Sequence, residues 1–387
     1  MKGSIFDKVT FNNGYQMPRY GIGPNKVQNI QKDGNVAGTD LYQKKTDAIT
    51  DFRRMLEVAV ENGFRSFDSG ARYGTEEDIG AFFRTCGLPR EELFVTTKVN
   101  NKMQGYDTTL KDFDDSMNKL GLDYVDLYMI HCPVPVKGLY VETWKAIEKI
   151  YKSGRAKAIG VSNFTVQHLY NLMDQTEIVP VVNQKEQHPF YVQPNLLAFE
   201  RRHNIISQSY SPLGMGKFAT DPRIQWLADK HGKSIAQIIL RWHVQSGFMV
   251  VTRSSAEKRI HENANIFDFE LSAEDMAFMS TLNHHDRIWH DPDRFPGTYA
   301  HVHVENVFRE AVDHELEAMK ADDETRERVK RDVETLLDAK DVDLTRDYII
   351  YCFTKAVAKH GPNANIEEQA CEEAVSLAKD AVARFTK

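Results

Sequence analysis

The stretch Ser66-Phe67-Asp68-Ser69-Gly70-Ala71-Arg72-Tyr73-Gly74 ends a short apolar strand with a carboxylate and places a tyrosine in the following turn. A helix is predicted next over residues 76–84, and another strand over residues 93–99. This order of strand, polar residue and helix recurs along the chain. Because the carboxyl ends of parallel strands meet at one mouth of a barrel, the polar residues at those ends are expected to share a site.

Eight strand candidates alternate with helical patterns between Tyr20 and Asn263, and several of them are apolar on both faces, as in a buried parallel sheet. An α/β fold of the (β/α)8 TIM barrel type explains this alternation best. A doubly wound sheet is the alternative, but no Gly-x-Gly-x-x-Gly opens a helix. The predicted strands cover residues 20–23, 64–68, 93–99, 125–131, 156–162, 181–186, 205–210 and 249–252.

Two further segments frame the predicted barrel. Residues 8–18 form a predicted hairpin around an Asn-Asn-Gly turn, a lid before the first strand. Residues 24–46 are polar and poorly periodic, which indicates either a mobile segment or a binding loop. From residue 296 onward, four charged helical patterns replace the alternation. We therefore expect a catalytic barrel over residues 1–295 and an all-α C-terminal extension over residues 296–387.

The role of the extension has three alternatives: it covers the mouth, packs on the outer helices, or joins subunits into a homo-oligomer. The whole chain of 387 residues has a net charge of −7 and no basic block, which excludes nucleic acid as an expected partner. No apolar run approaches the roughly 20 residues that span a bilayer, so neither a membrane nor a secretory route is expected. The four cysteines are scattered, as expected for reduced thiols in the cytoplasm.

Four side chains at the predicted mouth have complementary chemistry. Asp68, Lys98 and His131 lie at the ends of three successive strands, and Tyr73 lies in the loop after the first of them. A phenol is a weak acid near neutral pH, but an adjacent ammonium lowers its pKa, and a carboxylate keeps a buried lysine charged. A histidine can orient a substrate oxygen. This set suits proton donation to a carbonyl oxygen as hydride reaches its carbon.

The sequence from Thr10 to Phe295 resembles the aldo-keto reductase family. The resemblance is carried by residues 67–74, by Phe94-Val95-Thr96-Thr97-Lys98 and by the segment from Leu120 to His131. It implies that Tyr73 donates the proton, that His131 orients the carbonyl, and that Lys98 with Asp68 tunes the tyrosine.

The cofactor half of the family pattern is also matched. Residues 160–164 and 183–184 are similar to segments that hold the nicotinamide carboxamide, and residues 209–214 to the segment whose aromatic ring stacks on the nicotinamide. The resemblance implies nicotinamide or pyrophosphate contacts from Ser162, Asn163, Gln184, Tyr210, Ser211, Leu213 and Gly214.

Residues 251–263 resemble the site for the adenosine 2′-phosphate. A guanidinium can bind a phosphate through two parallel hydrogen bonds, so Arg253 favours NADPH, with NADH as the alternative. The implied contacts are Arg253, Ser254, Ser255, Arg259, Glu262 and Asn263.

The substrate pocket differs from the common family pattern. Asn25 stands where many relatives have an aromatic residue, Cys132 follows the histidine where tryptophan is common, and Trp289 is a candidate wall. The histidines at 284, 285, 290, 301 and 303 lack regular ligand spacing, so a solvated loop is expected there and no metal site. Together these features predict a cytoplasmic NADPH-dependent oxidoreductase that reduces a small aldehyde, ketone or sugar-like carbonyl. The alternative is a non-catalytic regulatory subunit with the same barrel and a bound nucleotide.

Overall fold

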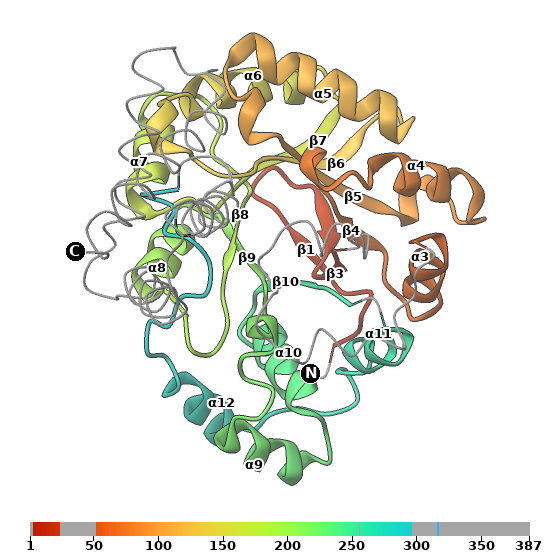
Figure 1. Ribbon diagram of the computed structural model, residues 1–387, viewed down its shortest axis with the longest axis vertical. Coiled ribbons are helices and arrows are strands. Elements are labelled where there is room, and N and C mark those ends of the chain that lie inside the picture. Colours follow the sequence, from red (N-terminus) through yellow and green to blue (C-terminus); the bar gives the residue numbers. More distant parts are fainter. Residues whose placement is uncertain (1–2, 24–51, 255, 296–315, 317–387) are drawn as a thin grey trace. The chain divides into compact units, whose positions relative to one another are not determined.

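The barrel fold is confirmed. The computed structural model describes residues 3–23, 52–254, 256–295 and 316. Within them, parallel strands close into a barrel in the order β10-β3-β4-β5-β6-β7-β8-β9, and helices surround it (Figure 1). The barrel strands are β3 (Tyr20–Ile22), β4 (Ser66–Asp68), β5 (Phe94–Val99), β6 (Val125–Ile130), β7 (Ala156–Ser162), β8 (Val182–Glu186), β9 (Ile206–Tyr210) and β10 (Met249–Thr252).

Helices occupy the segments between the barrel strands, as the alternation predicted, and the helix predicted over residues 76–84 extends one residue further, to Thr85. The helices contribute buried apolar residues to the core around the strands. One helix, α12, was missed, because it buries only Asp275 and Met279 and shows little periodicity. The helices are α3 (Phe52–Glu61), α4 (Glu76–Thr85), α5 (Tyr106–Leu120), α6 (Tyr140–Lys152), α7 (Val166–Asp174), α8 (Pro194–Arg202), α9 (Pro222–His231), α10 (Ile235–Gln245), α11 (Glu257–Ala264) and α12 (Ala273–Ser280).

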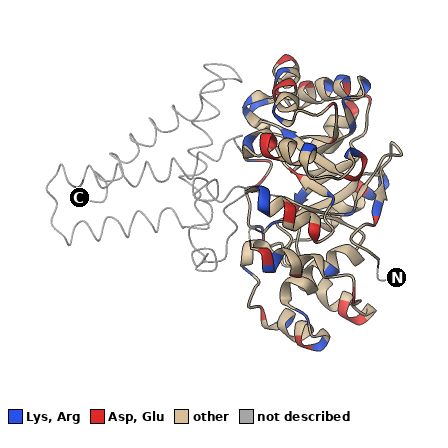
Figure 2. Cartoon of the chain, turned by 90° about the vertical axis from the view of Figure 1, so that its right-hand side faces the viewer, with Lys and Arg blue, Asp and Glu red and all other residues tan. Residues whose placement is uncertain are grey.

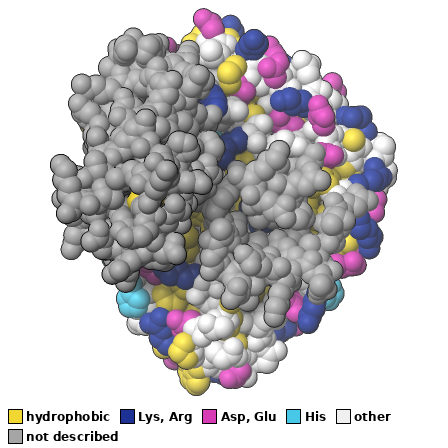
Figure 3. All heavy atoms as spheres, viewed as in Figure 1, with side chains coloured by type: hydrophobic (Ala, Val, Ile, Leu, Met, Phe, Trp, Pro, Cys, Tyr) yellow, Lys and Arg dark blue, Asp and Glu magenta, His cyan; other side chains and the backbone are white. Residues whose placement is uncertain are grey.

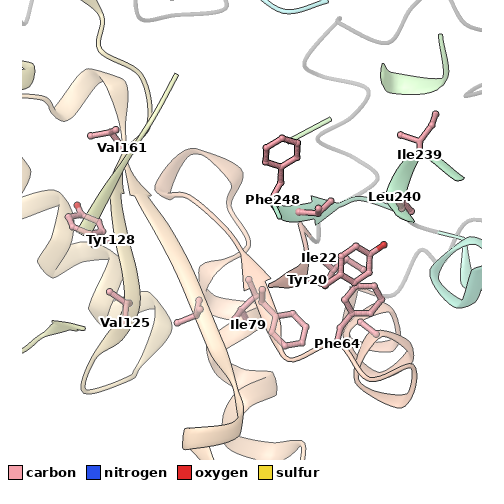
Figure 4. Close-up of a cluster of buried hydrophobic side chains, with 14 of the residues drawn as sticks. Tyr20, Ile22, Phe64, Ile79, Val125, Tyr128, Val161, Ile239, Leu240 and Phe248 are labelled. Atoms are coloured by element: carbon pink, nitrogen blue, oxygen red, sulfur yellow. The ribbon is translucent and has the colours of Figure 1, made fainter. Parts of the chain in front are cut away.

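The main hydrophobic core lies between the strands and the helices. Tyr20 and Phe64 stack within it with ring centroids 5.3 Å apart, and Figure 4 shows them beside Ile22. Phe248 and Leu240 extend the same core at β10 and α10. Burial of such side chains stabilises the fold by about 1.5–3 kcal/mol each, so this layer holds the strand ends in fixed positions.

The predicted hairpin is also confirmed. Strands β1 (Lys8–Thr10) and β2 (Gln16–Pro18) pair antiparallel. Val9, Phe11 and Met17 pack with residues from the amino ends of the barrel strands, including Phe94 and Met249. The hairpin therefore closes the base of the barrel, opposite the carboxyl ends of the strands.

Charged side chains of both signs are mixed over the helices in the part of the chain that the structure describes (Figures 2 and 3). None of the described helices is long and apolar enough to cross a membrane. The segment 24–46 and all but Leu316 of the predicted extension lie outside the described residues.

Candidate active site

The four predicted catalytic residues meet at the carboxyl ends of neighbouring strands. Asp68 is the last residue of β4, Lys98 is the penultimate residue of β5, and His131 directly follows β6. Tyr73 ends a 3-10 turn (Ala71–Tyr73) that leaves β4. Gly74 ends this turn with a φ of 63°, a conformation that glycine adopts without strain, so the turn returns the phenol to the mouth.

Asp68 and Lys98 form a buried ion pair. The Nζ atom of Lys98 lies 2.7 Å from Oδ2 of Asp68 and 2.7 Å from the carbonyl oxygen of Ser69. The Lys98 side chain is fully buried, and burial lowers its pKa although Asp68 opposes the shift. The ammonium is thus fixed by two acceptors below the mouth.

Tyr73 contacts both His131 and the buried lysine. Its hydroxyl lies 3.1 Å from Nε2 of His131, and the ammonium of Lys98 lies 5.3 Å from the centre of its ring. Burial, and next Asp68, raise the pKa of Tyr73, while Arg72 and Arg253 oppose the shift. We expected Lys98 to lower this pKa. Instead, desolvation by burial is the largest cause and raises it. The ammonium of Lys98 is paired with Asp68.

His131 is neutral near physiological pH. Burial lowers its pKa well below the ordinary value, and the charges of Lys98 and Arg72 lower it further. Its Nδ1 atom has no hydrogen-bond partner among the described residues. A neutral imidazole can donate one hydrogen bond and accept another, so Nε2 can serve the Tyr73 hydroxyl or an oxygen beside it.

Asn163 connects the tetrad to the predicted cofactor side. Its Nδ2 lies 3.0 Å from the carbonyl oxygen of His131 and 3.1 Å from Oγ of Ser162. The Tyr210 hydroxyl donates to its Oδ1 at 2.7 Å. Asn163 has a φ of 64°, a left-handed conformation that asparagine tolerates better than most residues. The structure thus brings Ser162, Asn163 and Tyr210 together beside His131.

Gln184 lies between the cofactor side and the ion pair. Its Nε2 donates to Oδ1 of Asp68 at 2.8 Å and to Oε1 of Gln208 at 2.9 Å. The carboxylate can only accept, which fixes the orientation of the Gln184 amide. Its carbonyl oxygen is therefore the atom left to accept a hydrogen bond from a ligand amide.

The Trp289 side chain contacts residues at the end of β9. Its indole Nε1 donates to Oγ of Ser211 at 2.9 Å, and its ring meets that of Tyr210 edge-on, 6.2 Å between centroids. Beyond this contact, Leu213 is half-buried and Gly214 has a φ of 57°. A side chain at position 214 would overlap Phe218, so this loop needs glycine.

The predicted phosphate-binding residues follow β10. Arg253 is exposed directly after the strand, and Ser254 accepts a hydrogen bond from the amide of Ala256 at 3.2 Å, just before α11. On α11, Arg259 is exposed, Glu262 is half-buried and Asn263 is buried, and Ser255 lies outside the described residues.

Cys132 is buried next to the tetrad. Asn163 Nδ2 lies 3.3 Å from its Sγ, and burial raises the pKa of the thiol to about 12. It is thus a protonated, compact wall of the mouth. Asn25 lies outside the described residues. The described residues contain no group of three or more His, Cys, Asp or Glu side chains that could hold a metal ion.

Sequence reasoning missed Gln208 and Glu186. Gln208 precedes the end of β9 by two residues, and Glu186 is the last residue of β8. The strand-end rule that selected Asp68 would also have selected Glu186. The backbone amides that contact Glu186, those of Ile288 and Trp289, could not be found in this way, because they lie 102 and 103 positions further along the chain.

The fold and the site define a barrel enzyme with a tyrosine, a lysine, an aspartate and a histidine at the mouth. Residues 37–284 match the aldo/keto reductase family. The chain is 44% identical over 293 residues to glyoxal reductase of Bacillus subtilis (strain 168), covering 76% of this chain and 99% of that protein. The chain belongs to the aldo/keto reductase family and is therefore an oxidoreductase.

Solved structures agree with this membership. A Gox0644 variant in complex with NADPH has a TM-score of 0.65 at 38% identity, covering 75% of this chain and 98% of the other. An aldo-keto reductase of Bombyx mori in complex with NADP has a TM-score of 0.65 at 31% identity, covering 75% and 97%.

Proposed function

We propose that this protein reduces a small carbonyl compound to an alcohol with NADPH, and that Tyr73 donates the proton. The observation that carries the proposal is the contact of the Tyr73 hydroxyl with His131 Nε2 at 3.1 Å, above the Lys98–Asp68 ion pair. A carbonyl oxygen between the hydroxyl and the imidazole would receive hydrogen bonds from both groups, which polarise it.

The donors and acceptors beside the tetrad fit a nicotinamide. Gln184 offers a carbonyl oxygen, Ser162 and Asn163 offer further polar groups, and the Tyr210 ring offers an apolar face. NADPH, when bound, supplies the hydride. The chain orients the ring, excludes water and keeps the proton on Tyr73, whose raised pKa holds the phenol protonated at neutral pH.

Arg253 supports NADPH over NADH. It is exposed directly after β10. Its positive charge acts on the mouth, because it opposes the rise in the pKa of Tyr73. An exposed guanidinium at a strand end can bind a terminal phosphate through two hydrogen bonds. Arg259 and the amino end of α11 would add donors on the same side.

Small aldehydes are the first substrate class to test, including glyoxal, since the glyoxal reductase of Bacillus subtilis is 44% identical over nearly its whole length. The test mixes the protein and NADPH with each compound of a carbonyl panel and measures the oxidation of NADPH by its loss of absorbance. Turnover with at least one aldehyde supports reduction. NADPH binding without turnover of any compound would favour the alternative, a non-catalytic subunit that binds the nucleotide.

Two further proposals accompany this function. The first is that the protein is cytoplasmic. The second is that the extension over residues 296–387 covers the mouth, packs on outer helices or forms a homo-oligomer. Deletion of residues 297–387 separates these roles. A changed KM for the carbonyl supports a cover, whereas a changed mass in solution with unchanged kinetics supports subunit contact.

A further inference from the structure

Glu186 ends β8 in a buried position. It is the register partner of Tyr210 on β9, so its side chain starts beside the proposed nicotinamide-stacking residue. Its side chain is only 5% exposed. An ionised carboxylate in such a place is costly unless hydrogen-bond donors surround it.

Three donors reach the Glu186 carboxylate. The amide of Ile288 donates to Oε1 at 2.7 Å, and the amide of Trp289 donates to Oε2 at 2.9 Å. His188 Nε2 lies 3.1 Å from Oε1. The two amide hydrogen bonds fix residues 288–289 to the end of β8, although these residues lie 102 and 103 positions further along the chain.

The Trp289 side chain links this fixed backbone to the end of the neighbouring strand, β9. Its indole N–H donates to Ser211, and its ring edge contacts Tyr210. Ser211 has a φ of 48°, which a non-glycine residue keeps only when its surroundings hold it. The Trp289 hydrogen bond is one such restraint. Glu186, Trp289 and Ser211 thus form a chain of contacts that ends at Tyr210.

We propose that Glu186 is a positioning residue for the cofactor, and that it acts by holding Trp289 against Tyr210 and Ser211. The inference rests on the proposed function in one respect, that Tyr210 stacks on the nicotinamide. In this role Glu186 touches neither cofactor nor substrate. It sets the position of an aromatic ring that does.

The chain contains a matched control for this chemistry. Glu148 on α6 is also buried and also accepts hydrogen bonds from two consecutive amides, Glu177 at 2.9 Å and Ile178 at 2.7 Å. Those amides lie in the loop before β8, at the base of the barrel. Glu148 therefore performs the same backbone capping without contact to the mouth.

The experiment compares Glu186→Gln with Glu148→Ala in the full chain. The two amides at Glu186 use both carboxylate oxygens, of which a glutamine keeps only one as an acceptor. Both amides at Glu148 donate to Oε1, so alanine is needed to remove that acceptor. Each variant should speed hydrogen exchange at its own amides, 288–289 or 177–178, as measured by mass spectrometry. Only Glu186→Gln should also weaken NADPH binding, by about tenfold in a fluorescence titration, the loss of roughly one charge-assisted hydrogen bond. If Glu186→Gln speeds exchange but leaves the NADPH Kd within about twofold of the parent, the proposed positioning role is wrong.

A second measurement covers the case in which Glu186→Gln does not fold. Trp289→Phe keeps the aromatic edge but removes the indole N–H, and Ser211→Ala removes its acceptor. The two variants should weaken NADPH binding to a similar extent, and the double variant should be no weaker than either alone. Additive effects would overturn the inference.

Tyr210→Ala separates the inference from the proposed function. Loss of NADPH affinity in this variant supports the stacking role. If Tyr210→Ala binds NADPH like the parent, the cofactor assignment itself fails. If Tyr210→Ala binds weakly while Glu186→Gln binds normally, only the positioning role fails.

Discussion

At the base of the barrel, Asp126 on β6 receives hydrogen bonds from Arg90 at 2.8 Å, from the Tyr15 hydroxyl at 2.6 Å and from the amide of Val95 at 2.8 Å. At the mouth, Asp68 pairs with Lys98, but the tyrosine hydroxyl there faces His131 instead of the carboxylate. Both ends thus combine an aspartate, a cation and a tyrosine.

The difference lies in where the tyrosine hydroxyl donates. The Tyr15 hydroxyl donates a hydrogen bond to a buried carboxylate, and burial and Asp126 raise the pKa of Tyr15, so this phenol ties the hairpin to the barrel. Tyr73 is held by a neutral imidazole, which a substrate oxygen can replace or share. The same residue types are therefore structural at one end and suited to proton transfer at the other, because their hydrogen-bond partners differ.

The largest expected difference between the ends comes from their tyrosines. Tyr73→Phe should lower kcat by about 10² to 10⁴-fold, the range for loss of a general acid, while NADPH affinity stays unchanged. Tyr15→Phe should keep turnover and lower the free energy of unfolding by about 1–3 kcal/mol, because Asp126 loses a donor. Turnover assays and urea unfolding measure the two effects. Substantial turnover in Tyr73→Phe would remove its role as proton donor.

The two cations provide the next test. Lys98→Met and Arg90→Met each leave a buried aspartate without its cation, which should cost about 3–5 kcal/mol of stability. Only Lys98→Met should also lower kcat, on the order of 10²-fold, because its ammonium lies beneath the Tyr73 ring. Kinetics below each variant's unfolding temperature separate the effects. Equal losses of kcat would mean that the Lys98 effect is one of stability alone.

Cofactor choice should depend on a single charge at the mouth side of β10. Arg253→Ala is expected to raise the Kd for NADPH by about 10 to 10²-fold, as one or two charge-assisted hydrogen bonds are lost, and to change the Kd for NADH little. Arg19, which donates to the carbonyl of Gly247 at the base, is the matched arginine, and Arg19→Ala should leave both constants unchanged. Equal weakening of both cofactors would place Arg253 away from the 2′-phosphate.

The smallest effect is expected from pH. The pKa of His131 is lowered, so its imidazole stays neutral unless pH falls below the ordinary value of 6.5. The pKa of Tyr73 is raised, so its phenol stays protonated unless pH rises above 10.0. Reductive kcat/KM should therefore change by less than about twofold between pH 6.5 and 8.5. A titration within this range would show that the pKa of His131 or Tyr73, or the lowered pKa of Lys98, lies in the range during the reaction.

The sequence was sufficient for the barrel and for the meeting of the four residues at its mouth. Strand periodicity placed Asp68, Lys98 and His131 at strand ends, and barrel geometry then required those ends to meet. The direction of the Tyr73 pKa shift could not be predicted, because it depends on burial and on the pairing of Lys98 with Asp68. The contact of Glu186 with residues 288–289 depends on a long-range loop path that local periodicity does not encode.

Closure of the barrel has a consequence for biosynthesis. Val250 of β10 pairs with Tyr20 of β3. The first barrel strand therefore has both edges hydrogen-bonded only after the last barrel strand has been synthesised. Until residues 249–252 leave the ribosome, β3 and β9 present open edges to other chains. Such long-range pairing slows folding and prolongs exposure to aggregation, so chains released before β10 are expected to be substrates for chaperones and proteases.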